Sequence, residues 1–182
     1  TAVAMVGGSR IALTSDNATH LVLGVTTADL PVSAPLAFVG FGIHSPEHSW
    51  DDYAATDVAG KAVIVMDGAP WDVDLSIPFG YDKALHKAVE AYQHGAKAVV
   101  YATDRYGQPD QPPATAFLMG FATEPIAILE TDQPGHSMVP PIVFVSYETA
   151  NRLLGNGTIQ AYQRQSRESM ESVGFDIPEA QF

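Results

Sequence analysis

Apolar and polar positions alternate in short runs along the chain, and this pattern predicts a strand-rich fold with a few short helices. Three unbroken apolar runs predict buried strands, because a strand that is apolar on both faces is usually covered on both faces. These runs lie at residues 62–66, 98–101 and 142–145. Shorter apolar runs between turn-forming residues predict further strands at 11–13, 21–23 and 36–39.

A change of period at residues 82–94 predicts an amphipathic helix. Its apolar residues recur at the spacing that places them on one helix face, and they are Leu85, Ala88, Val89 and Tyr92. Asp82 is expected to cap the N-terminus of this helix, and Gly95 suits the position just beyond its last turn.

Two further helices are expected towards the end of the chain. Ser146 is predicted to cap a short helix that carries Glu148 in its positive first turn and ends at Gly155. Residues 158–172 can form one more helix, although their apolar positions are sparse. Residues 104–141 are rich in proline and lack periodicity, which indicates a long irregular segment. This order of elements favours an α+β unit or a small barrel flanked by helices over a doubly wound sheet.

Composition narrows the class of protein. The 182 residues correspond to one domain, and 46% hydrophobic against 16% charged residues excludes a disordered chain. The net charge of −12 argues against nucleic acid and anionic membranes as partners. No cysteine is present, so disulfides, thiolate metal sites and cysteine catalysis are excluded, and no apolar run is long enough for a membrane helix.

Motifs for nucleotide binding and for serine hydrolysis both fail. Gly40-Phe41-Gly42 follows a predicted strand, but Ser45-Pro46 stands where a dinucleotide site needs the start of a helix. The string at 135–139 resembles a nucleophile elbow around Ser137, yet it has Val139 where a tight turn requires glycine. Both segments are therefore interpreted as ordinary loops.

A metal site is a weaker alternative. His44 and His48 stand four residues apart with Glu47 between them, but Pro46 disfavours the helix that would place both imidazoles on one face. Residues 47–74 carry a net charge of −6, half of the charge of the chain, without the spacing of a calcium loop. The simpler interpretation is that Asp51, Asp52 and Asp57 cap turns or accept bonds from backbone amides.

Several separated motifs, in order, resemble the protease-associated (PA) domain inserted in secreted zinc aminopeptidases of the co-catalytic two-zinc family. The first is the stretch from Phe38 to Tyr53, FVGFGIHSPEHSWDDY, followed by DVAGKAVIV at 57–65. The likeness continues through HGAKAV at 94–99 and PIVFVS at 141–146, and ends at the Leu153-Leu154 pair. Phe41 stands where the family usually has Tyr.

The resemblance implies an α+β fold, a small open β-barrel or sandwich of the PA type with two or three flanking helices, whose core covers residues 36–155. Strands within 1–35 would flank this core, and a C-terminal extension, 156–182, would lead towards a catalytic domain missing from this chain. It implies a non-catalytic role in shaping substrate access or mediating protein contacts, in a secreted or periplasmic protein. Its partners would be the catalytic domain of the same parent and a peptide or protein substrate. A structural role is expected for Trp50, Asp51, Asp52, Tyr53, Gly60 and Lys61.

The chain itself lacks the family's catalytic residues. No histidine begins an H-x-D motif and no two glutamates are adjacent, so no zinc or other cofactor is expected here, and zinc is expected only in the missing domain. One alternative is a free-standing or receptor-type PA module that binds a protein segment. Another is a small-molecule or metal-binding enzyme domain that uses His44, Glu47 and His48.

An interaction surface is expected in the irregular segment, because long loops in compact domains are usually functional or disordered. This segment carries large apolar residues that a surface loop cannot all bury, and those expected to meet a partner are Phe117, Leu118, Met119 and Phe121. The alternative is a lid that packs these side chains on its own barrel.

Overall fold

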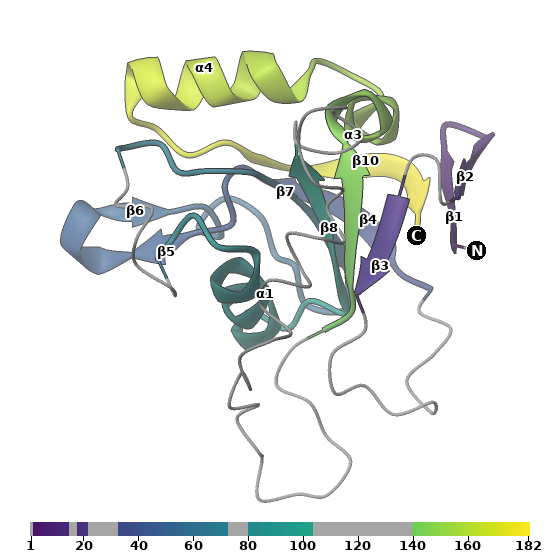
Figure 1. Ribbon diagram of the computed structural model, residues 1–182, viewed down its shortest axis with the longest axis horizontal. Helices are drawn as coiled ribbons and strands as arrows, with labels where there is room; N and C mark the ends of the chain where they lie inside the picture. Colours follow the sequence, from purple (N-terminus) through teal and green to yellow (C-terminus); the bar gives the residue numbers. More distant parts are fainter. Residues whose placement is uncertain (1, 15–17, 22–32, 73–79, 104–139) are drawn as a thin grey trace, which may run out of the picture.

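The computed structural model describes residues 2–14, 18–21, 33–72, 80–103 and 140–182. Within these ranges the chain forms one eight-stranded sheet in the order β2-β1-β10-β4-β7-β8-β9-β3, and a separate two-stranded hairpin of β5 and β6. The large sheet is mixed and curves into a half-barrel with three helices (Figure 1), which confirms the α+β fold class.

The centre of the sheet is parallel and corresponds to the apolar runs of the sequence. It consists of β4 (Pro35–Val39), β7 (Ala62–Met66), β8 (Ala98–Thr103) and β9 (Ile142–Ser146), paired in that order. All five residues of β7 and all six of β8 are buried, as expected for strands that are apolar on both faces.

Antiparallel strands extend both sides of this centre. On one side lie β10 (Gly174–Gln181), β1 (Ala2–Val6) and β2 (Ser9–Leu13); on the other lies β3 (Ala18–Leu21). Residues 156–182, expected as an extension, thus contribute a strand that lies between β1 and β4 inside the sheet. Of the strand expected at 21–23, Leu21 ends β3 and residues 22 and 23 lie outside the described ranges.

Helices cover both faces of the sheet (Figure 1). The helix α1 (Ala84–Gln93) packs on one face, where Ala88 contacts the cluster that holds Val63 and Val65. The opposite face is covered by α3 (Tyr147–Leu154) and α4 (Ile159–Ser169). Successive strand residues therefore pack alternately into two hydrophobic cores, one on each face of the sheet.

The helix ends follow the expected signals in part. The Ser146 hydroxyl accepts a hydrogen bond from the Thr149 amide, and Gly155 ends α3 in the left-handed conformation, so both expected caps of this helix are confirmed. The cap expected at Asp82 is wrong, because α1 begins after Lys83 without a side-chain cap. The Asp82 carboxylate pairs with the Lys83 ammonium at 2.7 Å instead of turning towards the helix amides.

The buried face of α1 also differs from the predicted stripe. Its buried residues are Lys87, Ala88 and Ala91, whereas Tyr92 of the predicted stripe is 40% exposed. The helix is thus rotated about its axis from the orientation that its apolar residues suggest. As a result, the side chain of Lys87 faces the interior.

The turn after β4 brings the first PA-like motif against the sheet. Gly40 and Gly42 both have positive φ, 53° and 67°, a conformation that other residues adopt at a cost. A side chain at Gly42 would place its Cβ 2.6 Å from the Val65 Cγ1, and one at Gly40 would lie 2.7 Å from the Asp52 Oδ1. These glycines are therefore required by close packing, not by a phosphate.

After this turn, the chain forms a small hairpin that packs beside α1. It consists of β5 (His44–Ser45), the 3-10 turn η2 (Pro46–His48) and β6 (Trp50–Asp51). Pro46 opens η2, where its missing amide costs nothing, and Ser49 closes it with a left-handed φ of 53°.

Replacing Gly42 by Ala is expected to destabilise the protein much more than replacing Gly60. Both glycines have positive φ, but a Cβ at Gly60 meets no atom within 4 Å, so Gly60→Ala adds only backbone strain. Gly42→Ala adds the clash with Val65 and is expected to cost about 1–3 kcal/mol more in urea-induced unfolding, the usual range for overpacking. Equal free energies of unfolding for the two variants would contradict this packing role.

Candidate functional site

The most unusual polar group in the described chain is the ammonium of Lys87, a residue of α1 whose side chain is fully buried. Its Nζ donates hydrogen bonds to the carbonyl oxygens of Met66 at 2.5 Å and Gly68 at 2.6 Å. The same ammonium lies 5.5 Å from the ring centroid of Phe41 and 5.6 Å from that of Tyr101. Backbone oxygens and aromatic faces together replace the water that burial removes.

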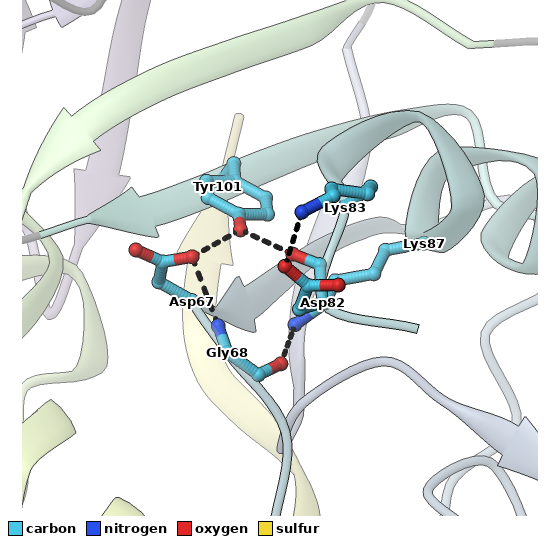
Figure 2. Close-up of polar contacts among 6 residues, drawn as sticks. All are labelled: Asp67, Gly68, Asp82, Lys83, Lys87 and Tyr101. Carbon is cyan, nitrogen blue, oxygen red and sulfur yellow. Dashed lines mark hydrogen bonds and ion pairs between the residues drawn. The ribbon is translucent and has the colours of Figure 1, made fainter. Parts of the chain in front are cut away.

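The carboxylates of Asp67 and Asp82 lie near this lysine, and the Asp67 carboxylate is bonded by hydroxyl groups (Figure 2). The Tyr101 hydroxyl lies 2.5 Å from the Asp67 Oδ1 and 3.2 Å from the Asp82 carbonyl oxygen. The Thr103 hydroxyl donates to the Asp67 Oδ2 at 3.2 Å. Asp67 follows β7 and Thr103 ends β8, so the network lies at the carboxyl end of the parallel strands.

The charge state of Lys87 is set by two opposing effects. Burial lowers its pKa to about 8, while the nearby carboxylates of Asp67, Asp52 and Asp82 raise it. At neutral pH the amine therefore remains mainly protonated and keeps its hydrogen bonds. Burial likewise raises the pKa of the Tyr101 phenol, so this hydroxyl stays a donor.

This network is built to hold structure. A catalytic base or nucleophile must reach its substrate, whereas Lys87 is fully enclosed and donates to two backbone carbonyls. The bonds fasten α1 to the segment that follows β7.

The carboxyl edge of the sheet is the usual ligand site in open α/β sheets. In this protein side chains of α4 reach the segment that follows β7 at this edge. The Gln163 Nε2 donates to the Asp67 carbonyl at 3.2 Å and lies 2.8 Å from the Tyr147 hydroxyl, and the Arg167 Nε donates to the Ala69 carbonyl at 3.2 Å. The chain's own helix thus takes the place of a ligand at these carbonyls.

The WDDY motif forms a second buried polar group beside this network. Asp52 is 1% exposed, and its Oδ2 accepts a hydrogen bond from the Ile43 amide at 3.0 Å. Burial raises the pKa of the Asp52 carboxyl to about 7, against the lowering effects of the Trp50 side chain and the Ile43 amide. Asp52 therefore titrates near neutral pH inside the protein.

The neighbours of Asp52 in the motif are packed or bonded locally. Trp50 and Tyr53 are 4% and 6% exposed, and the Tyr53 ring stacks on His94 with centroids 4.1 Å apart. The Asp51 Oδ1 accepts a hydrogen bond from the Tyr53 amide at 2.9 Å. Burial also raises the pKa of the Tyr53 phenol. The motif thus joins the hairpin to the end of α1.

Gly60 and Lys61 belong to the turn that leads into β7. The Gly60 amide donates to the Gly95 carbonyl at 2.9 Å, which ties this turn to the end of α1. The Lys61 ammonium pairs with the Asp176 carboxylate of β10 at 2.5 Å. Both residues therefore link elements that are distant in sequence.

The histidines considered for a metal site lie on different elements. His44 is in β5, with its Nδ1 3.5 Å from the Asp51 Oδ2. His48 ends η2, where its Nδ1 lies 2.7 Å from the Ser45 hydroxyl and its ring stacks on Trp71. Within the described ranges no group of three or more histidine or acidic residues is arranged to hold a metal ion.

Other candidates fall outside the described residues. These are the proposed interaction surface of Phe117, Leu118, Met119 and Phe121, and the elbow-like string around Ser137. Sequence reasoning missed Lys87, because a lysine inside a helix is normally expected on the solvent side.

Comparison with known proteins identifies no family. No protein-family model matches the chain, and no curated protein matches it. Solved structures that resemble it include an aminopeptidase from Aneurinibacillus sp. strain AM-1, with a TM-score of 0.41 and 15% identity over 98% of this chain. Two structures of a zinc aminopeptidase from Bacillus subtilis have TM-scores of 0.45 and 0.42, with 20% and 16% identity over 84% and 98% of this chain.

The chain spans only 27–31% of the length of these solved proteins. Identity and TM-score are both too low for the likeness to assign a function. In the part of the chain that the structure describes, no helix is both long enough and apolar enough to cross a membrane.

The buried carboxyl of Asp52 predicts a stability that falls as pH rises. Its pKa is raised from 3.8 to about 7 on folding, so between these values the folded protein holds a proton that the unfolded chain releases. The free energy of unfolding should therefore decrease from about pH 4 to pH 7 and lose this dependence above pH 7. In Asp52→Asn, which stays neutral, unfolding measured across this range should lack that component of the decrease.

Asp52→Ala separates the hydrogen bonds from the charge. It leaves the Ile43 amide without its acceptor and is expected to cost about 1–3 kcal/mol at pH 5, the range for an unpaired buried donor. Parallel pH profiles for the wild type and Asp52→Asn, or an Ala variant as stable as the parent, would contradict the role given to this carboxyl.

Lys87→Met is expected to lower the free energy of unfolding by about 1–3 kcal/mol, because methionine keeps an unbranched side chain, one atom shorter, but leaves the Met66 and Gly68 carbonyls without their donor. Lys97 is exposed and serves as the control: Lys97→Met should change stability by less than about 0.5 kcal/mol. Denaturant unfolding of both variants at pH 7 makes the comparison. If Lys87→Met proves as stable as Lys97→Met, the ammonium does not hold α1 in place.

Proposed function

We propose that this chain is a non-catalytic PA-type domain of a zinc exopeptidase of the aminopeptidase kind. In this role it shapes substrate access to a catalytic domain of the same parent protein, or mediates contacts with a peptide or protein substrate. Zinc belongs to that other domain, and the parent is secreted or periplasmic.

The observation that carries the proposal is that the residues of the PA-like motif serve to pack and connect elements of the fold. Its glycines Gly40 and Gly42 permit close packing, and its buried residues Trp50, Asp52 and Tyr53 join the hairpin to α1 and the sheet. A motif devoted to building a scaffold is what a non-catalytic module needs.

The polar groups support the same proposal. Lys87 and Asp52 are bonded to backbone groups, and α4 reaches the segment at the carboxyl edge of the sheet where an α/β enzyme binds its ligand. The sequence contains neither an H-x-D motif nor an adjacent glutamate pair, which the zinc site of such a peptidase requires.

The purified chain is expected to show no aminopeptidase activity towards chromogenic amino-acid substrates, with or without added zinc. A zinc aminopeptidase assayed in parallel confirms that the substrates and the metal are competent. Turnover by the chain that a chelator abolishes would contradict the assignment, because it would require a metal centre within these residues.

The gene that encodes this chain provides a second test. The same reading frame is expected to encode an H-x-D motif and an adjacent glutamate pair outside these residues. A complete reading frame without them would overturn the exopeptidase part of the proposal and favour the receptor-type module.

A further inference from the structure

We propose that the rings of His48, Trp71 and Tyr81, named the aromatic corner, form a binding surface for a peptide segment with lysine or arginine side chains. This inference rests on the proposed function, because it names what a non-catalytic module holds. It concerns a part of the molecule separate from the Lys87 network.

The aromatic corner is built from three segments that are distant in sequence. His48 stacks on Trp71 with centroids 4.1 Å apart and planes 8° from parallel. Tyr81 stands nearly perpendicular to both rings, 5.8 Å from each. Buried Trp50 supports the group from within, with its ring 5.9 Å from that of Trp71.

These rings lie at the surface and are held by side-chain contacts. His48 is exposed, while Trp71 and Tyr81 are half-buried. The Tyr81 hydroxyl donates to the Glu47 Oε1 at 2.6 Å, and the His48 Nδ1 lies 2.7 Å from the Ser45 hydroxyl. Rings that are fixed before binding lose little freedom when a partner arrives, which favours affinity.

The charge around the aromatic corner selects a cationic partner. The Glu47 side chain is 64% exposed beside the rings, and Asp72, next to Trp71, is exposed as well. The bond to Glu47 raises the pKa of the Tyr81 phenol against a lowering effect of Ser45, and the charges of Glu47 and Glu90 also raise this pKa. Two carboxylates therefore act on this ring.

Nearby lysines do not neutralise these carboxylates. Lys83 is paired with Asp82. Lys87 belongs to α1, and its side chain is fully buried in the interior. Aromatic faces attract cations, tryptophan most strongly, and carboxylates add a charge-assisted partner. A basic side chain thus finds both of its preferred contacts here.

The test uses the whole chain and synthetic peptides of alternating lysine and glycine, with matched peptides in which norleucine or glutamate replaces lysine. Calorimetry is expected to show binding of the lysine peptide about tenfold or more tighter than either matched peptide, with an affinity that falls as salt is added. Binding should also change the tryptophan fluorescence, because Trp71 lies in the surface.

Matched variants locate the site. Trp71→Ala and Glu47→Gln should each weaken lysine-peptide binding by about fivefold, the effect of losing one cation–π or ionic contact. Two control variants change residues outside the aromatic corner. Tyr92→Ala removes an exposed ring on α1, and Glu168→Gln removes an exposed charge on α4. Both variants should bind the lysine peptide as the parent does. Circular dichroism confirms folding, and Glu47→Gln serves as the surface test if Trp71→Ala is unstable.

Equal binding of the lysine and norleucine peptides would overturn the inference, and so would tighter binding of the glutamate peptide. It would also be overturned if the lysine peptide did not bind, or if Glu47→Gln bound it with the affinity of the parent. The activity and gene tests above do not involve these rings. An aromatic corner that binds nothing therefore defeats this inference and leaves the module assignment standing.

Discussion

The buried ammonium of Lys87 is the contact on which the arrangement of this domain depends. It bonds to the carbonyls of Met66 and Gly68 just where β7 ends, and it is delivered by a helix that crosses between β7 and β8. A lysine costs much free energy to bury unless every donor is compensated. The two bonds therefore tie α1 to the end of β7, beside the ring of Tyr101.

Asp52 is a second buried ionisable group near Lys87. Its carboxyl is buried beside the motif glycines, and its charge is one of those that favour protonation of Lys87. The two groups have pKa values shifted towards each other, the acid up to about 7 and the amine down to about 8. Burial is the largest cause of both shifts, and in each case it disfavours the charged form.

The hydrophobic pattern of the sequence predicted the centre of the sheet and parts of β2 and β3, but it missed β1 and β10 for a physical reason. Strands β7, β8 and β9 are apolar on both faces and stand out in any sequence. By contrast, β10 has only two buried residues, contains Pro178 and shifts register between Asp176 and Gln181, so its alternation is interrupted. Such a strand is recognised only when its neighbours are known.

The same limit applied to the site. The glycines and the WDDY motif were visible because their residue types are unusual in combination, and the structure accounts for them by close contacts such as that of Gly42 with Val65. Lys87 and the aromatic corner were not visible, because each depends on segments that only folding brings together. The predicted apolar stripe of α1 lies on a different side of the helix from Lys87. Hydrophobic periodicity considers only apolar residues, so it does not register that the carbonyls of Met66 and Gly68 accept bonds from this lysine.

In the proposed function, the polar groups of this domain serve two roles, one in the interior and one at the surface. Inside, at the carboxyl edge of the parallel strands, backbone carbonyls accept hydrogen bonds from Lys87, Gln163 and Arg167 of the chain itself. Outside, on the hairpin side, the rings of His48 and Tyr81 are rigid and stand among acidic groups. Aromatic and charged groups that stand together at one surface, above a closely packed interior, support the proposal that this module holds a partner while another domain carries out the chemistry.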